Sequence, residues 1–273
     1  MAIANVHGVR IFYDLNGIGS VPLVLVHGSW DSHHGWDLVV PALADSFTVL
    51  TYDRRGHSES ERPTGQGSMR EDVADLAALI ENLGLGPAWV AGNSFGASIA
   101  FQLAVEHPEL LRGVIAHDPP LFSLLVNDPS AAAMLDEGRR GIDSVVALIA
   151  SGDHAGAAEH FIDTMVLGPG AWAHLPADDR QMLIENAPTF LDEANDPEQF
   201  AVDIQRLATF RRPILLTTGA MSPPVYGRVV SVLADALPTV KVHRLPEAGH
   251  VPQVTDPDAY SDTLKEFIKT NAA

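Results

Sequence analysis

The chain contains no cysteine. A disulfide framework, a thiolate nucleophile and a zinc–thiolate site are therefore excluded. Basic side chains are also scarce, because 17 lysine and arginine residues stand against 35 aspartate and glutamate residues, giving a net charge of −18. Nucleic acids and anionic membrane surfaces repel such a chain, so we expect neither as a partner.

Long apolar runs are missing as well. No stretch approaches the length of a membrane span, and residues 1–5 lack the basic region and apolar run of a signal peptide. We therefore expect a cytoplasmic protein. The 273 residues are 46% hydrophobic, which is enough to bury a full core and excludes a disordered chain.

Segments typical of strands alternate with segments typical of helices over most of the chain. Strands are predicted over residues 9–13, 21–26, 47–52, 89–91, 113–117, 213–219 and 240–245. Helices are predicted over residues 36–44, 69–83, 95–105, 225–237 and 257–269. This alternation indicates an α/β fold with a mostly parallel sheet and helices on both of its faces.

The alternation stops between residues 121 and 209. Helix-like segments follow one another there without a strand, over residues 131–140, 144–150, 155–167, 178–186 and 197–207. The pattern predicts a core domain made of residues 1–120 and 210–273, with a helical cap of residues 121–209 inserted into it.

The motif Gly-x-Ser-x-Gly occurs at residues 92–96, between an apolar strand and a helix. It is typical of a nucleophile elbow, in which a sharp turn holds Ser94 clear of the sheet. Glycine is needed at 92 and 96 because a side chain there would collide with the neighbouring strand or helix. The motif predicts that the hydroxyl of Ser94 is the nucleophile.

Together with this motif, further residues make the chain similar to the α/β-hydrolase superfamily over essentially its full length. They are His27-Gly28 after an early strand, Gly249-His250 after the last strand, and the turn at residues 53–58. The resemblance implies an eight-stranded, mostly parallel sheet and a cap inserted after the sixth strand. Ligands of such folds bind at the carboxyl ends of the strands, where these residues fall.

A serine hydroxyl needs a base to take its proton, and an acid must orient that base. His250 follows the last strand, and the order of serine first and histidine last matches the superfamily. The acid usually follows the seventh strand, but residues 219–226 contain no carboxylate. A known variation places the acid after the sixth strand, which favours Asp118; Glu247 and Asp256 are rivals for that role.

In this respect the chain is similar to a fungal lactonase that opens the macrolactone zearalenone. That family also has a His–acid–Pro run after the sixth strand and no acid after the seventh. The likeness is local and does not fix the substrate.

The remaining parts of the predicted site are the hydrogen-bond donors to the oxyanion and the residues that line the substrate pocket. The backbone N–H groups of Ser29 and Phe95 are expected to bind the oxyanion. The substrate pocket is expected to contain Trp30, Trp172, Met165 and Phe161. His33 and His34 are adjacent without a completing carboxylate cluster, so we place them at the pocket rim or the surface and expect neither a metal nor a cofactor.

These residues predict a serine hydrolase that cleaves small-molecule carboxylic esters or lactones through an acyl-enzyme. Two alternatives stay open, a carbon–carbon bond hydrolase of diketones and a ligand sensor built on a hydrolase scaffold. Haloalkane and epoxide chemistry is not expected, because those branches of the superfamily have aspartate where this chain has Ser94. The sequence leaves open whether the chain forms a homo-oligomer.

Overall fold

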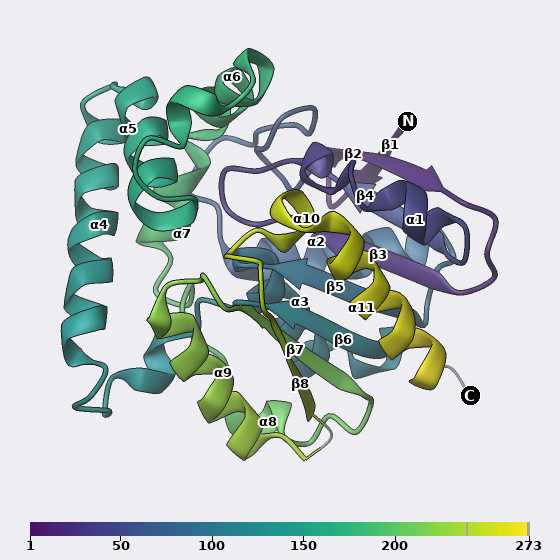
Figure 1. Cartoon of the computed structure of the whole chain (residues 1–273). Coiled ribbons are helices and arrows are strands. Elements are labelled where there is room, and N and C mark those ends of the chain that lie inside the picture. Colours follow the sequence, from purple (N-terminus) through teal and green to yellow (C-terminus); the bar gives the residue numbers. More distant parts are fainter. Residues whose placement is uncertain (239, 272–273) are drawn as a thin grey trace.

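The computed structural model describes residues 1–238 and 240–271. Its centre is an eight-stranded sheet with the order β1-β2-β4-β3-β5-β6-β7-β8 (Figure 1). β1 and β2 form a hairpin and β2 pairs antiparallel with β4, whereas the remaining neighbours pair parallel. The strands are β1 (Ala2–Val6), β2 (Val9–Asn16), β3 (Pro22–Val26), β4 (Thr48–Tyr52), β5 (Ala88–Asn93), β6 (Leu111–His117), β7 (Ile214–Gly219) and β8 (Val240–Leu245). This sheet confirms the predicted eight-stranded, mostly parallel fold.

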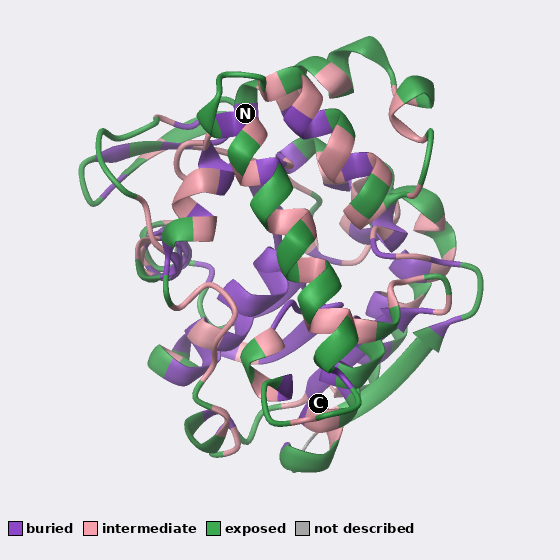
Figure 2. Cartoon of the chain, turned by 90° about the vertical axis from the view of Figure 1, so that its left-hand side faces the viewer, coloured by how far each residue is buried: buried purple, intermediate pink, exposed green. Residues whose placement is uncertain are grey.

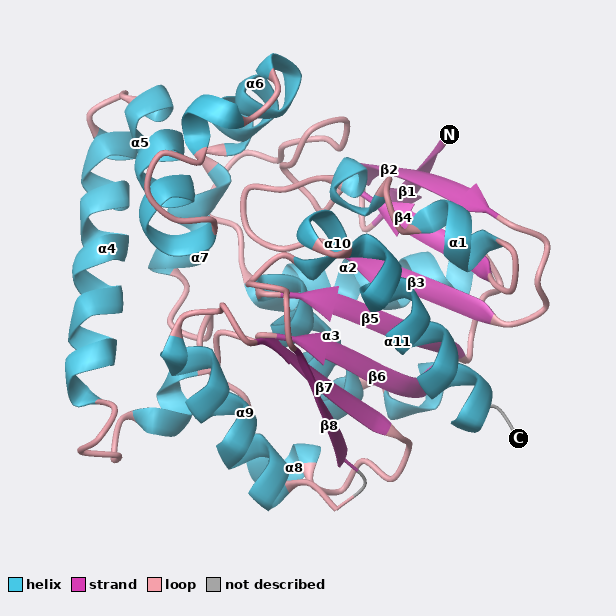
Figure 3. Ribbon diagram, viewed as in Figure 1, coloured by secondary structure: helices cyan, strands magenta, loops and turns pink. Residues whose placement is uncertain are grey.

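Helices cover both faces of the sheet (Figure 3). One hydrophobic cluster joins the sheet to α2, α3, α8 and α9, and a second joins its other face to α1 and α11. Strands β3, β5 and β7 are apolar and buried along nearly their whole length because both faces are covered. The bounds of these helices are α1 (Val40–Ala44), α2 (Met69–Asn82), α3 (Phe95–Glu106), α8 (Ile204–Leu207), α9 (Pro224–Ala236) and α11 (Pro257–Asn271).

Most of the segment between β6 and β7 is helical and lies beyond the carboxyl ends of the strands (Figure 1), whereas its last helix, α8, packs against α3 on one face of the sheet. The segment contains α4 (Ala132–Ala150), α5 (His154–Phe161), α6 (Ala177–Asn186), α7 (Thr189–Asn195) and α8. Figure 2 views the molecule from the side on which α4 lies. Exposed and half-buried residues alternate along α4, and the buried strands of the sheet lie behind it. The insertion has its own hydrophobic cluster, which includes one tryptophan of the core, Trp30.

Two helical segments of the insertion differ from the sequence prediction. Residues 131–140 and 144–150 belong to one helix, α4, because an internal glycine such as Gly141 weakens a helix by only about 1 kcal/mol and need not end it. Residues 197–207 are not one helix. The Asp203 carboxylate accepts from the Arg206 N–H at 3.0 Å and so caps a helix that begins only at Ile204.

Three further segments were wrong or missing in the prediction. The helix expected over residues 36–44 is a 3₁₀ turn, His33–Trp36, followed by the short α1. α7 and α10 (Pro252–Thr255) were not predicted, since each is too short to show a helical period. Within residues 1–238 and 240–271, no helix combines the length and apolar character needed to cross a bilayer.

Candidate active site

The three predicted catalytic residues follow the carboxyl ends of strands. Ser94 follows β5, Asp118 follows β6, and His250 ends the loop after β8. β5 and β6 are neighbours in the sheet, and the Ser94 N–H donates to the His117 carbonyl at 2.9 Å. The parallel arrangement therefore brings residues that are up to 156 positions apart in the chain to one edge of the sheet.

Ser94 lies in a sharp turn between β5 and α3. Its φ of 54° and ψ of −122° are sparsely populated for a residue with a side chain, so the surroundings must hold this backbone. A Cβ atom at Gly92 would collide with the Gly96 carbonyl, and one at Gly96 would collide with the Val26 carbonyl at the end of β3. The two glycines therefore provide the space that the turn requires.

The imidazole of His250 contacts the carboxylate of Asp118. Nδ1 of His250 lies 3.3 Å from Oδ2 of Asp118, and both side chains are buried. Burial works to raise the pKa of Asp118, but His117 and His250 outweigh it and hold this pKa well below its usual range. Asp118 is thus an anion next to the ring, and it orients His250 so that Nδ1 carries a proton and Nε2 is the basic nitrogen.

The two rival carboxylates lie elsewhere. Glu247 is exposed on the loop after β8, and Asp256 is half-buried between α10 and α11, where its carbonyl accepts from the Tyr260 N–H at 3.0 Å. Asp118 is therefore the carboxylate that the fold brings to His250.

Sequence reasoning missed three residues, Asn93, Gln253 and Tyr226, that hold His250 directly or through one another. The amide of Asn93, next to Ser94, donates to the His250 carbonyl at 2.7 Å, and Gln253 donates to the Asn93 side-chain oxygen at 3.2 Å. The Tyr226 ring stacks on the imidazole with centroids 4.4 Å apart. The position of Asn93 inside the Gly-x-Ser-x-Gly motif could have indicated it, whereas nothing local in the sequence indicates Tyr226.

The predicted oxyanion donors lie on two sides of Ser94. Phe95 is the first residue of α3, where N–H groups have no acceptor inside the helix and the helix dipole favours negative charge. On the other side, Gly28 leaves the loop after β3 close to Ser94, because a Cβ on Gly28 would lie 3.2 Å from the Ser94 Cβ. The adjacent Ser29 lines the same cavity as Ser94.

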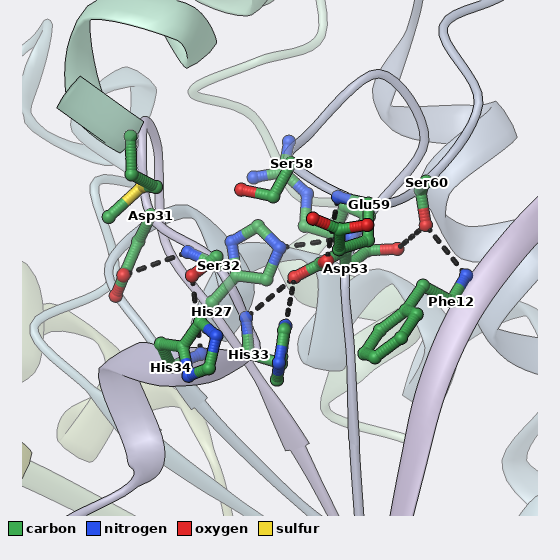
Figure 4. Close-up of polar contacts among 12 residues, drawn as sticks. Phe12, His27, Asp31, Ser32, His33, His34, Asp53, Ser58, Glu59 and Ser60 are labelled. Atoms are coloured by element: carbon green, nitrogen blue, oxygen red, sulfur yellow. Dashed lines mark hydrogen bonds and ion pairs between the residues drawn. The ribbon is translucent and has the colours of Figure 1, made fainter. Parts of the chain in front are cut away.

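Asp53 anchors the loop that carries Ser29 (Figure 4). Its carboxylate accepts from the His33 N–H at 2.7 Å, from His33 Nδ1 at 2.8 Å and from the Glu59 N–H at 3.1 Å. Burial works to raise the pKa of Asp53, but the hydrogen bonds from His33 outweigh burial and keep this pKa below its usual range. His33 is therefore buried against Asp53 and does not lie at the rim, whereas His34 is exposed as expected.

A cavity of about 570 Å³ opens over Ser94 and His250. Its walls combine the loop after β3 with α5, α6 and the turn that follows α5. The lining residues include Gly28, Ser29, Asp31, His34, Asp37, Leu38, Phe161, Ile162, Val166, Leu167, Asp178, Asp179, Met182, Leu183, Val251 and Val254. Its volume is in the usual range of small-molecule sites.

Of the four residues expected in the pocket, Phe161 lines this cavity. Trp30, Met165 and Trp172 are not among its lining residues. Trp30 is completely buried in the hydrophobic cluster of the insertion, where its ring stacks on Phe161 with centroids 4.9 Å apart. Met165 and Trp172 pack against the same cluster because their apolar surfaces are better covered there.

Comparisons with known proteins agree with this architecture. The family described as alpha/beta hydrolase fold matches residues 21–257. A soluble epoxide hydrolase from Corynebacterium sp. is 36% identical over 115 residues, which are 42% of this chain and only 40% of that protein. A putative non-heme bromoperoxidase from Mycobacterium tuberculosis is 30% identical over 273 residues, covering 95% of this chain and 98% of the relative.

The fold has close counterparts among solved structures. The crystal structure of an enol-lactonase from Burkholderia xenovorans superposes with a TM-score of 0.79 at 21% identity, covering 98% of this chain and all of the other. The match of the family over most of the chain, the eight-stranded sheet and the glycine-bounded turn at Ser94 agree with one another. The chain therefore belongs to the α/β-hydrolase fold family.

Proposed function

We propose that the protein is a serine hydrolase that cleaves carboxylic esters or lactones with Ser94, His250 and Asp118 as its catalytic triad. The observation that carries the proposal is a single arrangement. Ser94 in its strained turn and His250, whose ring contacts the buried anion Asp118, line the same cavity. We further propose that residues 121–209 act as the cap over this cavity, since Phe161, Met182 and Leu183 form part of its wall.

The reaction has two halves. His250 Nε2 takes the hydroxyl proton of Ser94 while Oγ attacks the substrate carbonyl carbon. The oxyanion that forms accepts hydrogen bonds from the N–H groups of Ser29 and Phe95. The intermediate collapses to an acyl-enzyme as His250 protonates the leaving alkoxide, and a water deprotonated by the same ring then releases the acid. For a lactone, the alcohol stays attached to the acyl group and both leave together.

A fluorophosphonate probe tests the proposal without knowledge of the substrate. The wild-type protein is expected to be labelled at Ser94, because the probe reacts only with an activated serine. Labelling is expected to disappear in His250→Ala and to persist in His34→Ala, which removes an exposed histidine of the same cavity. Intact-mass spectrometry measures the adduct. An unlabelled wild type would support a ligand sensor and contradict the hydrolase.

The charge of the cavity sets an expectation for the substrate. Asp31, Asp37, Asp178 and Asp179 line it, and among residues 1–238 and 240–271 neither lysine nor arginine does. We therefore expect neutral or cationic esters to be better substrates than carboxylate-bearing esters. The enol-lactonase, similar in fold alone, makes lactones the second class to assay.

Asp31 makes this expectation depend on pH. Burial raises its pKa to about 7, so the carboxyl is largely neutral near pH 6 and charged near pH 8. We expect the ratio of kcat/KM for a choline ester to that for its uncharged 3,3-dimethylbutyl isostere to rise about fivefold across this interval. That factor corresponds to the ~1 kcal/mol attraction of unit charges 4 Å apart in a water-like dielectric.

Taking the ratio cancels every effect of pH that acts equally on both esters. In Asp31→Asn the ratio is expected to stay flat over the same interval. A rise of equal size in wild type and variant would assign the effect to another group, and a flat wild-type ratio would remove Asp31 from substrate selection.

A further inference from the structure

We propose that Ser222 and His117 are positioning residues, which hold the Asp118 carboxylate against His250, and that Ser222 lies where a carboxylate could itself serve as the triad acid. The inference deepens the proposed function and rests on it. It starts from one oxygen atom, Oδ2 of Asp118, on which the Ser222 hydroxyl and both imidazoles converge.

The contacts of this oxygen are unusually dense. Ser222 Oγ lies 2.5 Å from it, His117 Nε2 lies 3.2 Å away and His250 Nδ1 lies 3.3 Å away. An ionised carboxylate only accepts, so the Ser222 hydroxyl and His250 Nδ1 donate to it, whereas His117 Nε2 lies close to the same oxygen and has its hydrogen bond to the Gly249 carbonyl at 3.1 Å. The other oxygen, Oδ1, is buried without a hydrogen-bond partner in the described part of the chain. The two hydrogen bonds to Oδ2 and the nearby N–H group of His117 therefore stabilise the buried charge.

The surroundings of His117 fix which nitrogen donates. Nε2 faces two acceptors, Asp118 Oδ2 and the Gly249 carbonyl at 3.1 Å, so it must carry a proton. Nδ1 faces the Thr217 hydroxyl at 2.9 Å, which can donate to it or accept from it. His117 is the last residue of β6 and is completely buried. It is not one of the residues that line the cavity over Ser94. It acts on the reaction through Asp118.

Ser222 stands on the loop after β7, the segment where the sequence has no carboxylate. The loop is tied to the one that carries His250, because the Met221 N–H donates to the Ala248 carbonyl at 3.0 Å. Gly219 permits this packing, since a Cβ there would collide with the carbonyls of Ala248 and Gly249. The backbone thus holds Ser222 firmly beside the histidine loop.

Ser222 Oγ and His250 Nδ1 touch the same oxygen atom. A carboxylate on residue 222 would therefore extend into the space that Asp118 Oδ2 occupies, within reach of the imidazole. This geometry predicts that an acid at 222 can replace an acid at 118, whereas a serine there only supports it.

The first test removes the donors. Ser222→Ala is expected to lower kcat about 10- to 100-fold with little change in KM, as for the loss of one charge-assisted hydrogen bond. Ser231→Ala, an exposed serine on α9, is the matched control and is expected to behave as wild type. His117→Phe, of similar shape, is expected to lower kcat in the same way, and His117→Gln, which keeps a donor near Nε2, is expected to restore part of it.

The second test moves the acid. Asp118→Gly empties the space of the carboxylate and tolerates the positive φ of 44° at this position. Asp118→Gly/Ser222→Asp is expected to be at least about 100-fold more active than Asp118→Gly, because the new carboxylate again selects the Nδ1–H tautomer. Two results would overturn the proposal: a folded double variant no more active than Asp118→Gly, or a Ser222→Ala variant indistinguishable from Ser231→Ala.

A spectroscopic readout separates this inference from the proposed function. The downfield proton NMR signal of the His250 Nδ1–H reports its bond to Asp118 and needs no substrate. It is expected to shift in Ser222→Ala and His117→Phe and to stay in Ser231→Ala. If wild type resists the fluorophosphonate probe, the proposed function fails while this signal still decides the positioning roles; an unchanged signal in both variants contradicts them even in an active enzyme.

Discussion

Asp118→Asn is expected to lower kcat by about 10⁴ while leaving the fold intact, as in other triads whose acid is changed to its amide. The substitution keeps the size and shape of the side chain but removes its charge. The amide can donate to Nδ1 of His250, which stabilises the tautomer with the proton on Nε2. In that tautomer the ring cannot accept the proton of Ser94, so the effect falls on kcat. Steady-state kinetics with a p-nitrophenyl ester, beside circular dichroism, measures both parts.

Glu247→Gln is the matched control, because it makes the same chemical change at an exposed position near His250 in the chain. It is expected to retain wild-type activity. An inactive Glu247→Gln together with a nearly wild-type Asp118→Asn would reverse the assignment of the acid.

Arg54→Met is expected to destabilise the protein by about 3–5 kcal/mol at pH 8, as for other buried ion pairs that lose one partner. The Arg54 guanidinium is buried, donates to Glu193 at 2.7 Å and to Asp72 at 3.2 and 3.3 Å, and lies over the Phe95 ring. Glu193 belongs to α7, so this cluster joins the insertion to the core. Methionine fills the space but leaves two buried carboxylates without their cation.

The loss is expected to be smaller at pH 5. Burial raises the pKa of Asp72 to about 6, above its ordinary value of 3.8, so the native state binds this proton more tightly than the unfolded chain. The contribution of Asp72 to wild-type stability is therefore greatest at low pH and is lost as the pH rises through about 6. At pH 5 the carboxyl is mostly neutral and has less need of the arginine. Urea unfolding at the two pH values gives the free energies of unfolding.

Arg70→Met provides the comparison. Arg70 also joins the core to the insertion, through a two-bond contact with Glu198 at 2.6 and 2.7 Å, but this pair is exposed. Water replaces the lost partner, so stability is expected to stay near that of wild type at both pH values. Equal losses in Arg54→Met and Arg70→Met would contradict the role given to burial.

The sequence predicts the sheet, the turn at Ser94 and the long helices of the core, α2, α3, α9 and α11, because these depend on local patterns. Apolar runs mark β3 and β7, and the glycines at 92 and 96 mark a turn wherever it lies in space. The sequence cannot indicate Ser222, which becomes informative only when β6 and β7 pair and bring it to Asp118, 104 residues earlier in the chain.

The insertion was harder to predict for a related reason. A helix as short as α7 has too few turns to show a period, and its glutamate matters only because Arg54 lies against it. Trp30 was predicted to line the substrate pocket. Its backbone adopts a φ of 67°, and its ring packs into the hydrophobic cluster of the insertion instead of lining the cavity.

That tryptophan bears on how molecules enter and leave. If the helices over the sheet swung outward as one rigid unit, the Trp30 ring would leave its buried environment and pull on the peptide shared with Ser29, so each opening would disturb one of the proposed oxyanion donors. A change of rotamer in Leu38 and Val254 would cost less than this movement of the helices. Both side chains line the cavity and are exposed, so they could let a substrate pass by moving alone. Exchange by movement of these side chains would keep the proposed oxyanion donors in place between turnovers.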